Sequence, residues 1–152
     1  AQKSHGHNDM FFIGRNVDYA ASMEGSLKLK EISYLHSEAY AAGELKHGTI
    51  ALIEKDRPVI ALACYEALFD KMMSNIKEVK ARGADVLGVT VAGYEEEIKK
   101  YVDHAIIVPR VHPMLQPSLT LIPLQIFAYY MALLRGCDVD KPRNLAKSVT
   151  VE

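Results

Sequence analysis

Four short and almost uninterrupted apolar runs constrain the fold of this chain more than any other feature. They are MFFIG (10–14), PVIALAC (58–64), DVLGVTVA (85–92) and DHAIIVPR (103–110). Strands that are apolar along most of their length are typical of parallel sheets, because helices cover both faces of such sheets. The sequence therefore predicts an α/β fold, a three-layer α/β/α sandwich around a mainly parallel sheet.

Segments with helical periodicity separate these runs, as expected of such a sandwich. They cover residues 19–41, 67–83, 95–102 and, in the most apolar part of the chain, 119–134. This last stretch, LTLIPLQIFAYYMALL, has about 16 residues, fewer than the roughly 20 that span a bilayer, and contains Pro123. We expect it to form a buried helix of a soluble domain and not a membrane span.

Length, charge and cysteine content fit one cytoplasmic domain. A chain of 152 residues is long enough for one ordinary core, and a net charge of −1 gives no general attraction to nucleic acid or anionic membranes. Two distant cysteines favour a reducing compartment. We expect a polar segment at residues 1–9 that is cut from a longer chain, a domain at 10–137 and an extended C-terminal tail at 138–152.

Three charged residues share one face of the first predicted helix. At 100° per residue, Glu24, Lys28 and Glu31 fall within an arc of roughly 60°. The commoner interpretation of such a stripe is a solvated ion pair of a few tenths of a kcal/mol. If the stripe faces a cleft instead, the lysine could attack a carbonyl group and a glutamate could act as a base.

The other polar motifs point to no metal or nucleotide. His47 in a glycine-flanked turn is more often structural than catalytic, and His36 is expected on another face of the first helix. His5 and His7 could bind a metal, but a disordered end is the favoured interpretation, and neither a CxxC nor an HExxH motif is present. The turn GRNVDY after the first strand is a candidate site wall, although it lacks a GxGxxG fingerprint.

Two long motifs resemble a known family. The stretch EGSLKLKEISYLHSEAYAAGELKHG and the ending DVDKPRNLAKSVTVE are similar to the C-terminal part of the glutamine–fructose-6-phosphate aminotransferases. The resemblance implies the second of two sugar isomerase (SIS) subdomains, which follow a glutaminase domain. It also implies a reaction that converts fructose 6-phosphate and glutamine to glucosamine 6-phosphate and glutamate, for hexosamine synthesis. It implies no metal or organic cofactor.

The resemblance also implies roles for individual residues. Lys28 would form an imine with the keto carbon of the opened sugar, and Glu31 would move a proton between the first two carbons. Glu24 would be a second acid beside the lysine. His47 would assist ring opening, reaching the site from the neighbouring subunit of a homodimer.

The resemblance places two tail residues, Ala146 and Lys147, in a loop that folds over the sugar and binds it, and it also implies that Lys147 is a catalytic residue. The sequence departs from the family's common pattern at Asn16, Ala20 and Thr49, where glycine, proline and proline are frequent. These departures affect turn conformation and not the groups implied in catalysis.

The sequence lacks two parts of the complete enzyme that the resemblance implies. Neither the serine- and threonine-rich phosphate loop of the first SIS subdomain nor the glutaminase cysteine is present, so we expect this chain alone to have little or no synthase activity. Two alternatives remain open. One is a non-catalytic SIS module that binds a phosphosugar to regulate another process, and the other is a dimerisation domain built on the apolar helix.

Overall fold

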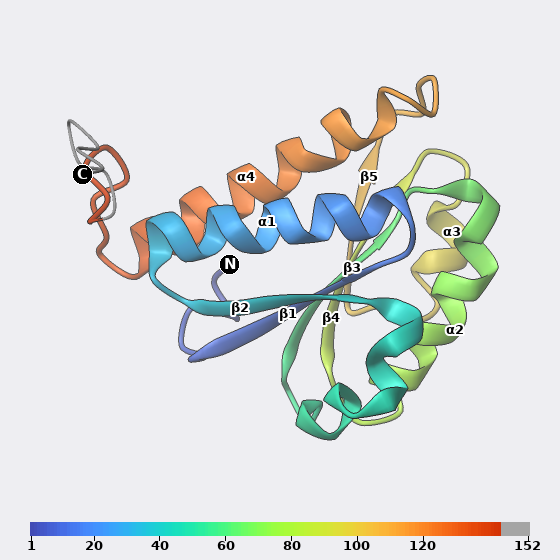
Figure 1. The fold of residues 1–152 in the computed structure, drawn as a ribbon, viewed down its shortest axis with the longest axis horizontal. Helices are drawn as coiled ribbons and strands as arrows, with labels where there is room; N and C mark the ends of the chain where they lie inside the picture. The colour runs from blue at the N-terminus through green and yellow to red at the C-terminus, as the bar shows by residue number, and fades with distance from the viewer. Residues whose placement is uncertain (144–152) are drawn as a thin grey trace, which may run out of the picture.

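The computed structural model describes residues 1–143, in which strands and helices alternate along the chain (Figure 1). One sheet contains all five strands: β1 (Asp9–Gly14), β2 (His36–Ala41), β3 (Pro58–Ala63), β4 (Asp85–Val91) and β5 (His104–Val108). The strands are hydrogen-bonded in the order β2-β1-β3-β4-β5, and every neighbouring pair is parallel. The predicted α/β fold with a parallel sheet is therefore confirmed.

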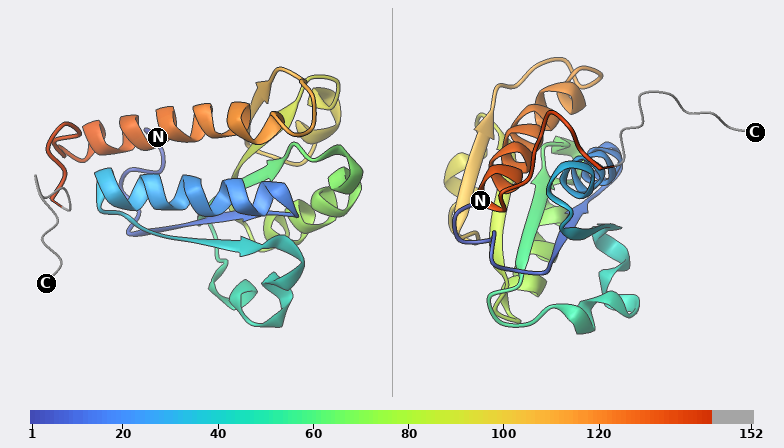
Figure 2. Two further views of the ribbon diagram at one scale, coloured as in Figure 1. Left: turned by 45° about the horizontal axis from the view of Figure 1, so that its top comes forward. Right: turned by 90° about the vertical axis from the view of Figure 1, so that its left-hand side faces the viewer.

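Helices cover both faces of this sheet, which gives the three predicted layers. Helices α1 (Val17–Ser33) and α4 (Gln116–Leu134) lie side by side on one face (Figures 1 and 2). Helices α2 (Phe69–Lys80) and α3 (Glu95–Ile98) lie on the other face. Side chains alternate across β1, so that Phe12 enters the cluster under α1 and α4 while its neighbours in sequence enter the cluster under α2.

The first helix is shorter than predicted. Helical periodicity suggested residues 19–41, but α1 ends at Ser33 because Tyr34 adopts a left-handed conformation (φ 57°, ψ 18°). Residues 36–41 then form β2 at the sheet edge, so His36 lies on a strand and not on the helix. Ser37 ties this strand to α1, because its hydroxyl donates to the carbonyl oxygen of Ser26 over 2.9 Å.

The buried face of α1 consists of small residues, which lets the helix lie close to its neighbours. It includes Ala21, Ser22, Gly25 and Ser26. A Cβ atom on Gly25 would lie 2.7 Å from Leu124 Cδ1 on α4. Because the buried face of α1 packs this closely, the helix cannot rotate freely, and the direction of its outward face is set.

The apolar helix α4 is only partly buried, contrary to the prediction of a buried helix. Its inward face packs on α1 and the sheet, but an outward stripe remains exposed: Ile122, Ile126, Tyr129 and Leu133. By length and composition α4 could cross a membrane, but a helix packed in a folded domain passes the same test, so this is weak evidence for a membrane span.

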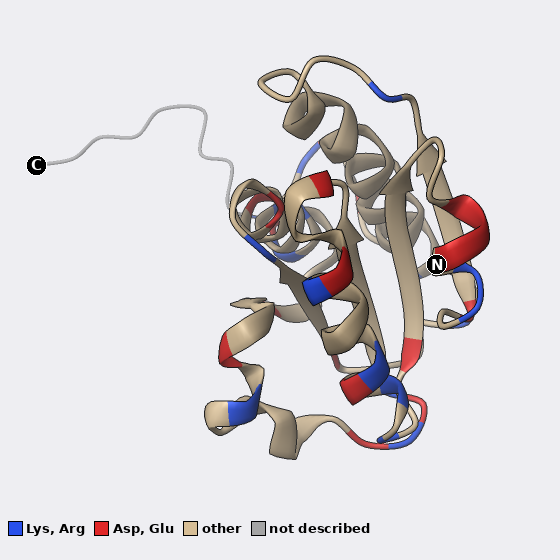
Figure 3. Cartoon of the chain, turned by 90° about the vertical axis from the view of Figure 1, so that its right-hand side faces the viewer, with Lys and Arg blue, Asp and Glu red and all other residues tan. Residues whose placement is uncertain are grey.

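Charged residues of both signs are scattered over the described surface (Figure 3). The most acidic short segment is the first turn of α3, which contains three consecutive glutamates at 95–97. This turn is followed by Lys99 and Lys100, each paired with a glutamate of the same turn. The surface therefore carries mixed charge, in agreement with the net charge of −1.

Candidate active site

The charged stripe of α1 forms one connected cluster, as its helical spacing predicts. The ammonium nitrogen of Lys28 lies 2.8 Å from Glu31 Oε2 and 3.5 Å from Glu24 Oε1. The three side chains are 33–40% exposed, so the cluster lies on the outward face of α1 and is open to an approaching molecule. An amine and two carboxylates at these distances can exchange protons and can meet a carbonyl compound.

The charge environment favours the protonated form of Lys28. Its hydrogen bond to Glu31 is the largest influence and raises the pKa of the lysine above its usual range, with Glu24 adding a smaller Coulombic effect. Attack on a carbonyl group requires the neutral amine, whereas the described neighbours of Lys28 favour the cation. A nucleophilic step at Lys28 must therefore begin with the removal of a proton, and Glu31 is the closest carboxylate that could accept it.

His47 lies far from this cluster within one chain. It ends the short 3-10 helix η1 (Ala42–His47), which follows the carboxyl end of β2. The start of α1 lies near this edge of the sheet (Figure 1), whereas Lys28 lies about 16 Å along the helix axis, toward the other end. Within the described part of the chain the charged neighbour of the exposed imidazole is Glu44, at 3.9 Å.

Asp18 belongs to no motif in the sequence, although it lies in the turn GRNVDY, the candidate site wall. Its side chain is 4% exposed, and Oδ2 accepts the backbone N–H groups of Cys64 and Tyr65, both over 2.8 Å. Burial raises the pKa of this carboxyl to about 6. Asp18 thereby joins the start of α1 to the carboxyl end of β3. An acidic residue in the first turn of a helix was the only sequence signal for it.

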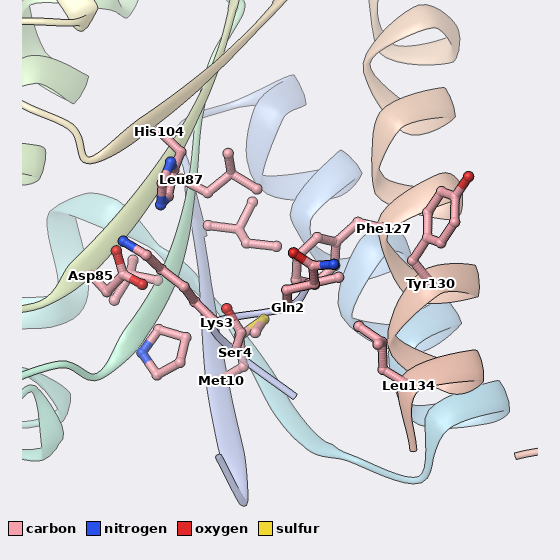
Figure 4. Close-up of a pocket in the computed structure, with 14 residues that line it drawn as sticks. Gln2, Lys3, Ser4, Met10, Asp85, Leu87, His104, Phe127, Tyr130 and Leu134 are labelled. Carbon is pink, nitrogen blue, oxygen red and sulfur yellow. The ribbon is translucent and has the colours of Figure 1, made fainter. Parts of the chain in front are cut away.

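Two of the cavities in the described part of the chain lie at opposite ends of the strands, and the charged stripe lines neither of them. The larger, about 530 Å³, lies at the amino ends of β3, β4 and β5, with Asp85, His104 and Lys3 on one side and Phe127 and Tyr130 on the other (Figure 4). The second, about 410 Å³, lies at the carboxyl ends of the strands and is lined by residues that include Asp18, Cys64 and Gln116. The Glu24–Lys28–Glu31 cluster thus lies on an open helix face.

The structure bears differently on the predicted tail residues and on the histidines considered as metal ligands. Ala146 and Lys147 lie outside the described residues. Among residues 1–143, no group of three or more histidine, cysteine, aspartate or glutamate side chains could hold a metal ion. His5 instead contacts the carbonyl oxygen of Gln2 through Nδ1, at 2.7 Å.

Comparison with known proteins places the chain in a family. The model of the SIS domain matches residues 5–135. The chain belongs to the SIS domain family. This SIS domain is 60% identical to a glutamine–fructose-6-phosphate aminotransferase (isomerizing) of Clostridium tetani and 53% identical to one of Thermus thermophilus, over 152 residues in each case. Each match covers the whole of this chain and 25% of the relative, so the SIS domain spans about a quarter of the length of these proteins and corresponds to their C-terminal part.

A solved structure agrees with this placement. The C-terminal domain of glucosamine-fructose-6-phosphate aminotransferase from Francisella tularensis superimposes with a TM-score of 0.86 at 37% identity. The match covers 91% of this SIS domain and 39% of that chain. A glucosamine-6-phosphate deaminase from Thermotoga maritima is similar at a TM-score of 0.69 and 29% identity.

Proposed function

We propose that this chain is the second SIS subdomain, at 10–137, and the tail, at 138–152, of a cytoplasmic glutamine–fructose-6-phosphate aminotransferase. In that enzyme it would help to convert fructose 6-phosphate and glutamine to glucosamine 6-phosphate and glutamate. One observation carries the proposal: the Glu24–Lys28–Glu31 cluster lies on a helix of a chain whose whole length is 60% identical to such enzymes. A phosphosugar-binding regulatory module would have no need of an amine held between two carboxylates.

Each residue of the cluster has a chemical role in this proposal. Lys28 loses its proton, attacks the keto carbon of the opened sugar and forms an imine as the carbonyl oxygen leaves as water. Ammonia released from glutamine would then displace the lysine from this carbon. Glu31 then carries a proton between the first two carbons, because its hydrogen bond to Lys28 holds it within reach of the same carbons. Glu24 keeps the region around the cationic imine negative.

The position of His47 supports a homodimer in which this residue serves the partner's site. One chain does not bring His47 to Lys28, so an imidazole that opens the sugar ring would have to come from a second subunit. The exposed stripe on α4 is a further surface that the complete enzyme could cover, since monomers rarely leave such a contiguous apolar face in water. Ala146 and Lys147 would close over the sugar from the tail.

The test uses the complete enzyme that ends in this chain. Lys28→Ala and Glu31→Gln should each lower the turnover of fructose 6-phosphate by about 10²- to 10⁴-fold. The matched control is Lys30→Ala, which removes an exposed lysine two residues away on the same helix. Lys28→Ala enzyme with the turnover of the unmodified enzyme would exclude the proposed role.

The isolated chain gives a second test, by calorimetric titration with fructose 6-phosphate. We expect no measurable heat, because the phosphate-binding loop that the resemblance implies belongs to the first SIS subdomain. Sub-millimolar binding would show instead that this domain forms a sugar site by itself.

A further inference from the structure

The segment that follows α4 is docked on the C-terminal end of α1. Arg135 donates from Nε to the carbonyl oxygen of Ser33 over 3.1 Å, and Cys137 Sγ lies 3.6 Å from the same oxygen. This carbonyl belongs to the last turn of α1, where helix carbonyl groups lack partners within the helix. The path of the segment is visible where the chain turns back beside the end of α1 (Figures 1 and 2).

Tyr34 forms the last described contact of this segment. Its hydroxyl oxygen accepts the backbone N–H of Arg143 over 2.9 Å, and the guanidinium carbon of Arg143 lies 3.7 Å from the centroid of the tyrosine ring. A hydrogen bond and a cation–π contact therefore act on one residue of the segment. The two contacts restrain both its backbone and its side chain.

The backbone of Tyr34 fixes the direction of this ring. The residue is in the left-handed conformation and its N–H donates to the carbonyl oxygen of Lys30, so it ends α1 while remaining part of the last turn. Tyr34 follows Lys28 by six residues, or about 9 Å of helix. The ring that holds Arg143 and the amine that is proposed to attack the sugar thus lie on one rigid element.

We propose that Tyr34 is a positioning residue, which fixes the start of the C-terminal tail relative to Lys28 and Glu31. This inference rests on the proposed function, since the tail matters for catalysis only if the cluster on α1 binds the sugar. Through Tyr34, the helix that carries Lys28 and Glu31 also sets the position of Arg143. In this proposal Tyr34 does not itself contact the substrate.

Limited trypsin digestion of the 152-residue chain tests the contact without any reference to activity. Trypsin cuts after Arg143, because asparagine follows it, whereas Pro142 protects the bond after Lys141. Tyr34→Ala should speed cleavage after Arg143 by at least about tenfold, since both contacts are lost. Tyr34→Phe keeps the ring and should give an intermediate rate.

The matched control is Tyr101→Ala, which removes an aromatic ring that lies under Lys77 in another cation–π pair, 4.2 Å from its centroid. It should leave cleavage after Arg143 unchanged. Cleavage after Lys80 and Arg82 reports whether a variant has become unstable as a whole. Tyr34→Ala protein with the original rate after Arg143 would overturn the proposal.

Kinetics of the complete enzyme test the functional part. Tyr34→Ala should raise KM for fructose 6-phosphate about tenfold with a smaller change in kcat, and Tyr34→Phe should restore most of the loss. Unchanged kinetic constants in Tyr34→Ala enzyme would refute the positioning role. If Lys28→Ala enzyme is active, the proposed function fails, while the digestion still decides whether Tyr34 holds Arg143.

Discussion

Lys28 is held as a cation by its two carboxylate neighbours, and the largest influence is one hydrogen bond. The ammonium group lies 2.8 Å from Glu31 Oε2, and this contact is the main cause of its raised pKa. The same carboxylate would therefore first stabilise the resting amine and then receive its proton. The effect of Glu31 on the charge of Lys28 can be measured by titration, separately from its proposed role in the reaction.

Glu31→Gln should lower the pKa of Lys28 toward that of a free lysine. The amide keeps the size of the side chain and removes the negative charge, so the protonated amine loses its strongest partner. An NMR titration of the lysine side chains measures this shift directly. Glu44→Gln, on η1, is the control that should leave Lys28 unaffected, and an unchanged Lys28 pKa in Glu31→Gln protein would contradict the described geometry.

Asp18 should make the folded state less stable as the pH rises from 4 to 7. Its pKa is about 6 in the folded chain and 3.8 in the reference state, so the folded state binds the proton more tightly. The stabilising contribution is complete below pH 4 and is lost as the pH rises through 6. The size is on the order of 3 kcal/mol for a shift of this size.

Asp18→Asn should remove this pH dependence, because the amide oxygen can still accept the N–H groups of Cys64 and Tyr65. Urea unfolding at pH 4.5 and at pH 7.5 gives the two free energies of unfolding for each protein. Asp70→Asn, at an exposed position on α2, is the control. If the free energy of unfolding changes equally between pH 4.5 and pH 7.5 in the Asp18→Asn and unmodified proteins, Asp18 is not the source of the pH dependence.

At the scale of elements, the junction between β1 and α1 sets the position of the helix face that carries Glu24, Lys28 and Glu31. A Cβ atom on Gly14 would lie 2.5 Å from the backbone carbon and oxygen of Asp18, and 2.8 Å from Ser22 Oγ. Backbone atoms cannot move aside as a flexible side chain can. The strand therefore has to end in glycine for the helix to start this close to it.

Gly14→Ala should destabilise the domain by about 3 kcal/mol or more, because α1 must shift along the sheet to make room. Chemical denaturation followed by circular dichroism measures the loss. The control is Gly6→Ala, where an added Cβ would meet no atom within 4 Å. A Gly14→Ala domain as stable as the Gly6→Ala domain would show that the junction is not close-packed.

The sequence predicts four of the five strands, and the physical reason for the missed one is plain. β1, β3, β4 and β5 are apolar runs, whereas β2 has the polar sequence HSEAYA and lies at the sheet edge. Its partner β1 lies far away in the sequence, so local periodicity cannot reveal the pairing. The length of α1 was overestimated for the same reason.

In the candidate site, too, contacts within one helix could be predicted from the sequence, whereas contacts that depend on the tertiary fold could not. Helical spacing alone places Glu24, Lys28 and Glu31 together, because one helix carries all three. The distance between His47 and Lys28 depends on how β2 lies beside β1. The bonds from Asp18 to Cys64 and Tyr65 cross 46 and 47 residues, so no local pattern contains them.

At the scale of the whole molecule, the separation of His47 from Lys28 gives a test of the proposed homodimer. Mixed dimers of Lys28→Ala and His47→Ala complete enzymes should regain about one quarter of the unmodified activity. Random pairing makes half of the dimers hybrid, and one of the two sites in each hybrid is intact. The measurement is turnover of fructose 6-phosphate after joint refolding. No recovery above the separate variants would mean that each subunit uses its own His47.

The packing of α1 under α4 also has a consequence for how the chain is made. α1 ends at Ser33 and α4 begins at Gln116, so a ribosome adds roughly 80 residues between them, which takes about 4–16 s. During that interval α4 cannot pack on the small-residue face of α1 or on the apolar side of β1, so both remain exposed. A nascent chain should therefore depend on chaperones until α4 has emerged, and amino-acid changes in α4 should reduce the yield of folded protein before they affect any reaction.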